Sequence, residues 1–136
     1  MKSLLQIVIL IAACSVCWGQ VKLATLGVRN PGDCQHISEI RSDVSSTGFP
    51  AGWTVYVSCT TQSWDLVLRQ ADSVGRTHTG FTNRKNRITV INGAMYSSGF
   101  SQFGTLKSGA SVLRHELGHI ICNCSDEDKA DRAVGF

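Results

Sequence analysis

Apolar and polar residues alternate in two stretches of the chain, and each stretch predicts a short β-strand. In residues 53–59, every second residue is apolar or cysteine, and threonine, tyrosine and serine lie between them. In residues 87–92, Ile88 and Val90 share one face of the predicted strand. A weaker apolar run over residues 21–28 predicts a further strand near the start of the folded part.

Apolar residues that recur every three or four positions predict helices. The predicted helices span about residues 33–45, 61–74 and 106–122, and a short last helix opens at residue 125. We expect Asp33 to cap the first helix. Residues 76–85 and 97–104 are polar and irregular, so we expect loops there. The layout predicts one small α+β domain over residues 20–136, with the long helix packed on a short mixed or antiparallel sheet.

The first 19 residues resemble a secretory signal peptide. After Lys2, residues 4–13 are apolar except for Gln6, and this stretch is too short for a membrane span of ~20 residues. Cleavage after Gly19 would make Gln20 the first residue of the mature chain. In an alternative interpretation, residues 11–14 form a bacterial lipobox and Cys14 carries a lipid anchor at the membrane surface. Both interpretations export the chain.

Four cysteines remain after the predicted cleavage, and they are Cys34, Cys59, Cys122 and Cys124. An even number of cysteines in a small exported domain predicts disulfide bonds. Because Cys122 and Cys124 are so close in sequence, we expect each of them to pair with Cys34 or Cys59. Buried free thiols are the alternative.

Composition narrows the class of protein. The chain has 136 residues, of which 43% are hydrophobic and 17% charged, a balance that excludes an intrinsically disordered protein. The net charge of +3 comes from scattered lysines and arginines rather than from a basic stripe. The sequence therefore gives no support to nucleic acid as a partner.

The sequence His-Glu-Leu-Gly-His at residues 115–119 lies on the predicted long helix. Residues four positions apart project from the same face of a helix, so His115 and His119 can bind one metal ion. Glu116 lies beside the first histidine, where it can take a proton from a water molecule. Gly118 lowers helix stability, which indicates that another segment packs closely against the backbone at this point.

A second group of acidic residues follows in the predicted last helix. Glu127 and Asp131 are one turn apart, so one carboxylate can bind the metal while the other orients a histidine ligand. The residues alone leave Glu127, Asp128 and Asp131 open as the third protein ligand.

Together, residues 115–119 and the Glu-x-x-Ala-Asp sequence at residues 127–131 resemble the gluzincin zinc metallopeptidases, including their IrrE-like and HtpX-like groups. The resemblance covers about residues 105–136 and the predicted strand over residues 87–92. It implies a small zincin-like domain in which that strand is the sheet edge that holds an extended substrate.

The resemblance also implies the roles of the site residues. One zinc ion per chain would be bound by His115, His119 and Glu127, with Glu116 as the general base. Asp131 would orient a ligand without binding the metal. Peptide-bond hydrolysis further requires a hydrogen-bond donor for the oxyanion, and Tyr96 is the best-placed candidate.

These residues predict an exported zinc metallopeptidase, a hydrolase that acts on a peptide or protein substrate. Two alternatives stay open. One is an exported binding module in which zinc only holds the fold, and the other is a cell-wall amide hydrolase with the same chemistry. Glu116 favours an enzyme over the binding module, because a structural site has no use for a base.

Overall fold

A computed structural model of the protein describes residues 20–70, 79–98, 100–102 and 105–136. The predicted signal peptide and the alternative lipid anchor at Cys14 lie outside these residues. The end of the predicted second helix also lies outside them.

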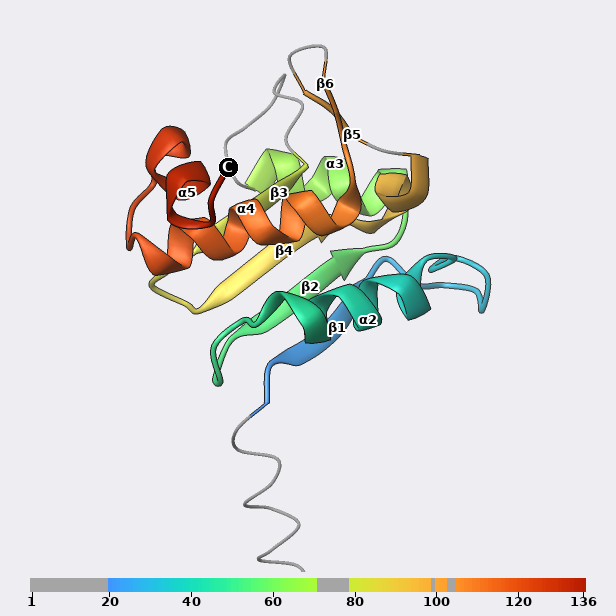
Figure 1. Cartoon of the computed structure of the whole chain (residues 1–136). Helices are drawn as coiled ribbons and strands as arrows, with labels where there is room; N and C mark the ends of the chain where they lie inside the picture. Colours follow the sequence, from blue (N-terminus) through green and yellow to red (C-terminus); the bar gives the residue numbers. More distant parts are fainter. Residues whose placement is uncertain (1–19, 71–78, 99, 103–104) are drawn as a thin grey trace, which may run out of the picture.

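The centre of the domain is a four-stranded sheet in the order β1-β2-β4-β3 (Figure 1). The strands are β1 (Lys22–Leu26), β2 (Thr54–Ser58), β3 (Gly80–Asn83) and β4 (Ile88–Asn92). β1, β2 and β4 run parallel, whereas β3 pairs antiparallel with β4. The mixed sheet and its helices confirm the predicted small α+β fold.

The sheet corrects the expected position of the strand over residues 87–92. β4 lies between β2 and β3, so it is an internal strand and the edge-strand prediction was wrong. The edge beside it is β3, which falls in a segment predicted to be irregular. Its residues Gly-Phe-Thr-Asn carry little apolar alternation. Pairing with β4 and the stacking of Phe81 on Trp64, with ring centroids 5.7 Å apart, fix this strand instead.

The helices cover both faces of the sheet. They are α2 (Ile37–Thr47), α3 (Thr61–Gln70), α4 (Gly109–Ile121) and α5 (Glu127–Ala133). Figure 1 shows α2 and α4 together on one face, α3 on the other, and α5 packed against α4. Fully buried aliphatic side chains fill the core under α2 and α4, among them Ile40, Val55, Ile91 and Leu113.

Two local predictions differ from the structure. The first helix begins at Ile37 with His36 as its N-cap, and Asp33 accepts the backbone N–H groups of Arg29 and Asn30 instead, both at 2.8 Å. Asp33 therefore closes a turn before the helix. The predicted loop over residues 97–104 contains the end of a 3-10 helix, η1 (Gly93–Ser98), and part of a hairpin formed by β5 (Phe100–Gln102) and β6 (Thr105–Lys107).

Two disulfide bonds are present, Cys34–Cys59 and Cys122–Cys124. The expectation that Cys122 and Cys124 pair with the other two cysteines was wrong. Asn123, between them, has a left-handed backbone with φ of 48°, and this turn brings the two Cα atoms to 5.2 Å. That separation lies within the range that a disulfide requires.

Disulfide bonds persist in oxidising compartments, so the two bonds fit an extracellular protein. Among the described residues, no helix has the length and apolar character to cross a membrane.

Candidate metal centre

The centre begins with one face of α4. Ser108 caps this helix by accepting the backbone N–H of Ser111 at 3.1 Å. One turn separates His115 from His119, and their Nε2 atoms lie 3.1 Å apart. Their side chains are only 15% and 10% exposed, so α4 holds two imidazoles together at the rim of the core.

α5 adds two carboxylates to this face. Asp126 caps α5 by accepting the backbone N–H of Lys129 at 2.9 Å. The first helical residue, Glu127, then places Oε2 at 2.6 Å from Nε2 of His115 and 3.6 Å from Nε2 of His119. Asp131, one turn later, places Oδ1 at 2.6 Å from Nδ1 of His115.

Gly118 determines how closely α5 approaches α4. A Cβ atom at this position would collide with the backbone of Ala130, mainly with its carbonyl oxygen. Ala130 is itself fully buried against α4. The close packing predicted from Gly118 is therefore confirmed, and it brings the carboxylates of α5 within reach of the histidines.

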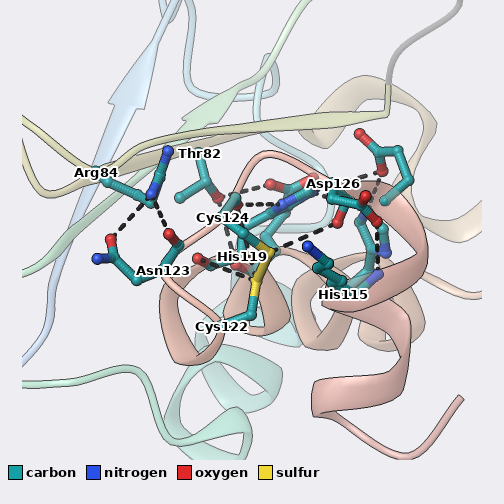
Figure 2. The surroundings of a disulfide bond; sticks show 11 residues. Thr82, Arg84, His115, His119, Cys122, Asn123, Cys124 and Asp126 are labelled. Carbon is teal, nitrogen blue, oxygen red and sulfur yellow. Dashed lines mark hydrogen bonds and ion pairs between the residues drawn. A yellow bond between two sulfur atoms is a disulfide. The ribbon is translucent and has the colours of Figure 1, made fainter.

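The Nδ1 atoms of both histidines are occupied by acceptors. Nδ1 of His119 lies 3.0 Å from the carbonyl oxygen of Cys124, next to the Cys122–Cys124 disulfide (Figure 2). A carbonyl can only accept a hydrogen bond, so this ring nitrogen carries the proton. In the neutral tautomer, Nε2 of His119 then presents a lone pair. The carboxylate of Asp131 favours the same tautomer in His115.

Three acceptor atoms consequently converge on one point. They are Nε2 of His115, Nε2 of His119 and Oε2 of Glu127, with separations of 2.6, 3.1 and 3.6 Å. Ligands at ~2.0–2.1 Å from a tetrahedral zinc ion lie about 3.3 Å from one another. The three atoms suit a zinc ion in number and chemical type, and their separations lie on either side of this spacing, with the shortest one at hydrogen-bond distance. Without a cation or proton between them, the three atoms would repel one another.

The pKa shifts of these residues also support a cation site. The carboxylate of Glu127 raises the pKa of His115 to about 9, against the opposing effect of burial, and Asp131 adds to the rise. Glu127 likewise raises the pKa of His119, while the two histidines hold the pKa of Glu127 well below its usual range. The three groups therefore form a site that attracts positive charge.

Glu116 faces β3 rather than the converging atoms. Its side chain is buried, and Oε2 accepts a hydrogen bond from the hydroxyl of Thr82 at 2.6 Å. The Thr82 hydroxyl lies 3.1 Å from that of Thr89. Burial raises the pKa of Glu116, and the Thr82 hydrogen bond opposes the rise.

Glu116 still lies close to the histidines. One ligand-type atom from each of His115, Glu116 and His119 lies within 4.8 Å of the others, so these three residues could also hold a metal ion, and Glu116 is near enough to contact a molecule bound there. Gly80 of β3 leaves the space that its carboxylate fills, because a Cβ atom at Gly80 would lie 2.9 Å from Oε1. The edge strand therefore forms the wall of the pocket for this carboxylate.

The structure places the remaining candidates elsewhere. Tyr96 is buried against Gly109, and its hydroxyl donates to Asp43 of α2 at 2.7 Å, so these contacts support a structural role rather than an oxyanion donor. Burial and Asp43 together raise the pKa of the Tyr96 hydroxyl. In the part of the chain that the structure describes, Asp128 is exposed and makes no hydrogen bond or ion pair with either histidine.

Two contributors have no signal in the sequence. Thr82 lies 34 positions from Glu116, in a segment without strand alternation. The carbonyl of Cys124 reaches His119 only because residues 122–124 turn back on α4. The first contact depends on tertiary structure, and the second depends on the turn at residues 122–124.

Comparison of the chain with models of known protein families, with curated protein sequences and with solved structures found no match.

Proposed function

We propose that the protein is an exported zinc-dependent peptidase in which His115, His119 and Glu127 bind the metal. The observation that supports catalysis is the position of Glu116. A buried carboxylate beside two histidines is costly, and a purely structural site would not need it. Here Oε2 accepts a hydrogen bond from Thr82, and Oε1 is left for proton transfer.

A zinc ion in this centre would supply Lewis-acid chemistry, polarising a water molecule and the carbonyl group of the substrate. The residues of the chain supply the proton transfer. Oε2 of Glu116 is occupied by Thr82, so Oε1 is the atom that would hold the proton taken from water and pass it to the leaving amine. Asp131 and the Cys124 carbonyl keep the two imidazoles in one tautomer during this transfer.

The sheet edge supports a peptide substrate. Within the described residues, β3 is one of the two edge strands of the sheet, opposite β1, and α4 packs beside it. The unpaired side of such a strand offers backbone N–H and C=O groups to an extended peptide. A peptide added there would run past Glu116, which lies against Gly80 and Thr82.

Export is part of the proposal. The signal-like residues 1–19 and the two disulfides both suit a protein that leaves the reducing cytosol. The lipid anchor at Cys14 is the alternative route, and it would keep the domain at the membrane surface.

The test is Glu116→Gln in the zinc-loaded protein, assayed on a general protein substrate with and without a chelator. We expect this variant to keep its full zinc content, because the proposed ligands are unchanged. Hydrolysis should fall by ~10²–10⁴-fold, because the proton acceptor is removed. Glu39→Gln, at an exposed position of α2, is the matched control and should keep activity. Zinc-loaded wild type that cleaves nothing, or Glu116→Gln with wild-type rates, would favour a structural zinc module.

A further inference from the structure

The Cys122–Cys124 disulfide lies in the connection between the two helices that carry the metal centre. α4 ends at Ile121 and α5 begins at Glu127, so the bond closes the first part of this connection. Both cysteines are half-buried, which leaves them within reach of solvent. Figure 2 shows the bond directly beside His119.

Residue Cys124 contacts His119 at two points. Its carbonyl oxygen lies 3.0 Å from Nδ1 of the imidazole, and its backbone N–H donates to the carbonyl of His119 at 3.3 Å. The first contact fixes the orientation and tautomer of the ring. Anything that moves Cys124 therefore moves the acceptor on which the His119 ligand depends.

The turn that places Cys124 is held from both sides. Asn123 has a left-handed backbone, which glycine and asparagine adopt more readily than other residues. Its side-chain oxygen accepts a hydrogen bond from Arg84 at 2.9 Å, and its carbonyl accepts a second from the same guanidinium group. The disulfide ties the residues on either side of Asn123 together, so it opposes relaxation of this turn.

We propose that the Cys122–Cys124 disulfide is a redox-sensitive lock on the metal centre. Closed, it holds the Cys124 carbonyl on Nδ1 of His119 and keeps metal affinity high. Open, it releases the turn and lowers the affinity. This inference rests on the metal centre proposed above, and Cys124 acts in it as a positioning residue through His119.

The opening step needs a dithiol reductant. The dithiol gives two electrons and two protons to the pair, and the S–S bond between Cys122 and Cys124 breaks into two thiols. The reductant itself closes to a cyclic disulfide. Air or an oxidising partner reverses the step by removing the same electrons and protons.

The other disulfide provides a matched control. Cys34–Cys59 joins the segment before α2 to the end of β2, and Cys59 is buried in the core. Among the described residues, neither cysteine contacts a histidine or carboxylate of the centre. Loss of this bond should lower thermal stability while leaving metal affinity unchanged.

The experiment compares zinc Kd values in the full chain by competition with a chromophoric chelator. The variants are Cys122→Ser with Cys124→Ser, and Cys34→Ala with Cys59→Ala. In a second arm, metal-free wild type is treated with dithiothreitol and freed of reductant under argon. Thiol labelling checks that the newly formed thiols are those of Cys122 and Cys124, circular dichroism checks the fold, and the protein is then titrated with zinc. Part of the sample is reoxidised before titration.

We expect zinc affinity to fall about 10–100-fold in the Cys122/Cys124 variant and in reduced wild type, as for loss of a partner that orients a ligand. Reoxidation should restore it, and the Cys34/Cys59 variant should bind as wild type does. Equal affinity of oxidised and reduced wild type would overturn the lock but leave the metal centre intact. Unfolding of the reduced chain would also overturn it, in favour of a structural bond. If oxidised wild type binds no zinc, the proposed centre itself fails.

Discussion

Glu127 and Asp131 come from one short helix, yet they contact different nitrogens of His115. Glu127 lies at the converging Nε2 atoms, whereas Asp131 lies behind the ring at Nδ1. Removal of Glu127 should therefore remove a ligand, and removal of Asp131 should remove only the group that orients one.

We accordingly expect Glu127→Ala to lose most zinc affinity and Asp131→Ala to lose about 10–100-fold. Asp128→Ala should bind zinc as wild type does, because its side chain is exposed and apart from the histidines. Zinc titration of the three metal-free variants measures all three effects. Loss of zinc from Asp131→Ala with retention by Glu127→Ala would reverse the two assignments.

Thr82 is expected to affect hydrolysis without affecting the metal. Thr82→Val keeps the shape of the side chain but removes the hydroxyl that donates to Glu116. Hydrogen bonds to charged groups contribute about 1.5–3 kcal/mol, so we expect kcat to fall about 10–100-fold at unchanged zinc content. Thr82→Ser, which keeps the donor, should retain most activity. A Thr82→Val protein with the wild-type kcat would show that this hydrogen bond does not contribute to the proposed proton transfer by Glu116.

The contact between α4 and α5 depends on a single glycine. In an exposed helix, Gly118→Ala would stabilise by about 1 kcal/mol. Here the added methyl group meets the carbonyl of Ala130, so α5 must move away and take Glu127 and Asp131 with it. We expect a lower melting temperature and weaker zinc binding, measured by calorimetry and by metal titration. Gly32→Ala, where nothing lies within 4 Å of the added Cβ atom, is the control. A stabilised Gly118→Ala protein would contradict the packing.

Elements whose signal is local could be predicted from the sequence. Apolar periodicity identified α4, β2 and β4, because each carries its own pattern, and the acidic residues at its start identified α5. β3 could not be predicted in this way. Its four residues form a strand only because they pair with β4. The same pairing places β4 inside the sheet instead of at its edge.

The same distinction separates the parts of the candidate site. The two histidines are one helical turn apart, and so are the two carboxylates. The sequence therefore predicts that each pair lies on one face of its helix. It does not predict the contacts of Glu116 with Thr82 and of His119 with Cys124. The first joins segments 34 positions apart, and the second depends on the left-handed backbone at Asn123, which also made the Cys122–Cys124 pairing unexpected.

Metal binding should stabilise the whole domain in a manner that depends on pH. Zinc that binds only the folded chain adds about 2.7 kcal/mol at a concentration of 100 times Kd. The metal requires neutral imidazoles, whereas the pKa of His115 in the metal-free protein is raised to about 9. Below that pH a proton must leave before zinc binds, so affinity rises as the pH increases toward 9.

We therefore expect the rise in melting temperature produced by a fixed zinc concentration to be larger at pH 8 than at pH 6. In the metal-free protein, the contribution of His115 to the free energy of unfolding falls as the pH increases, which is the opposite trend. The stability that protonated His115 gains from Glu127 is fully present below its unfolded pKa of about 6.5 and is lost as the pH rises through about 9. Scanning calorimetry with and without zinc separates the two trends. His115→Ala should remove both, and a zinc effect that shrinks with increasing pH would exclude the histidines as ligands.

The compact placement of the centre along the chain has a consequence for folding. His115 and Asp131, near its two ends, are only 16 positions apart, and Gly118 and Ala130 bring their helices together. Short loops close quickly and at small entropic cost. A helical hairpin of this kind can capture an ion before the parallel strands, which need distant partners, have assembled. If the proposed centre binds zinc, the metal would then serve as an early nucleus, and the wall around Glu116 would form only when β3 joins the sheet. The ability to bind zinc would then precede the ability to hydrolyse a substrate in the life of each molecule.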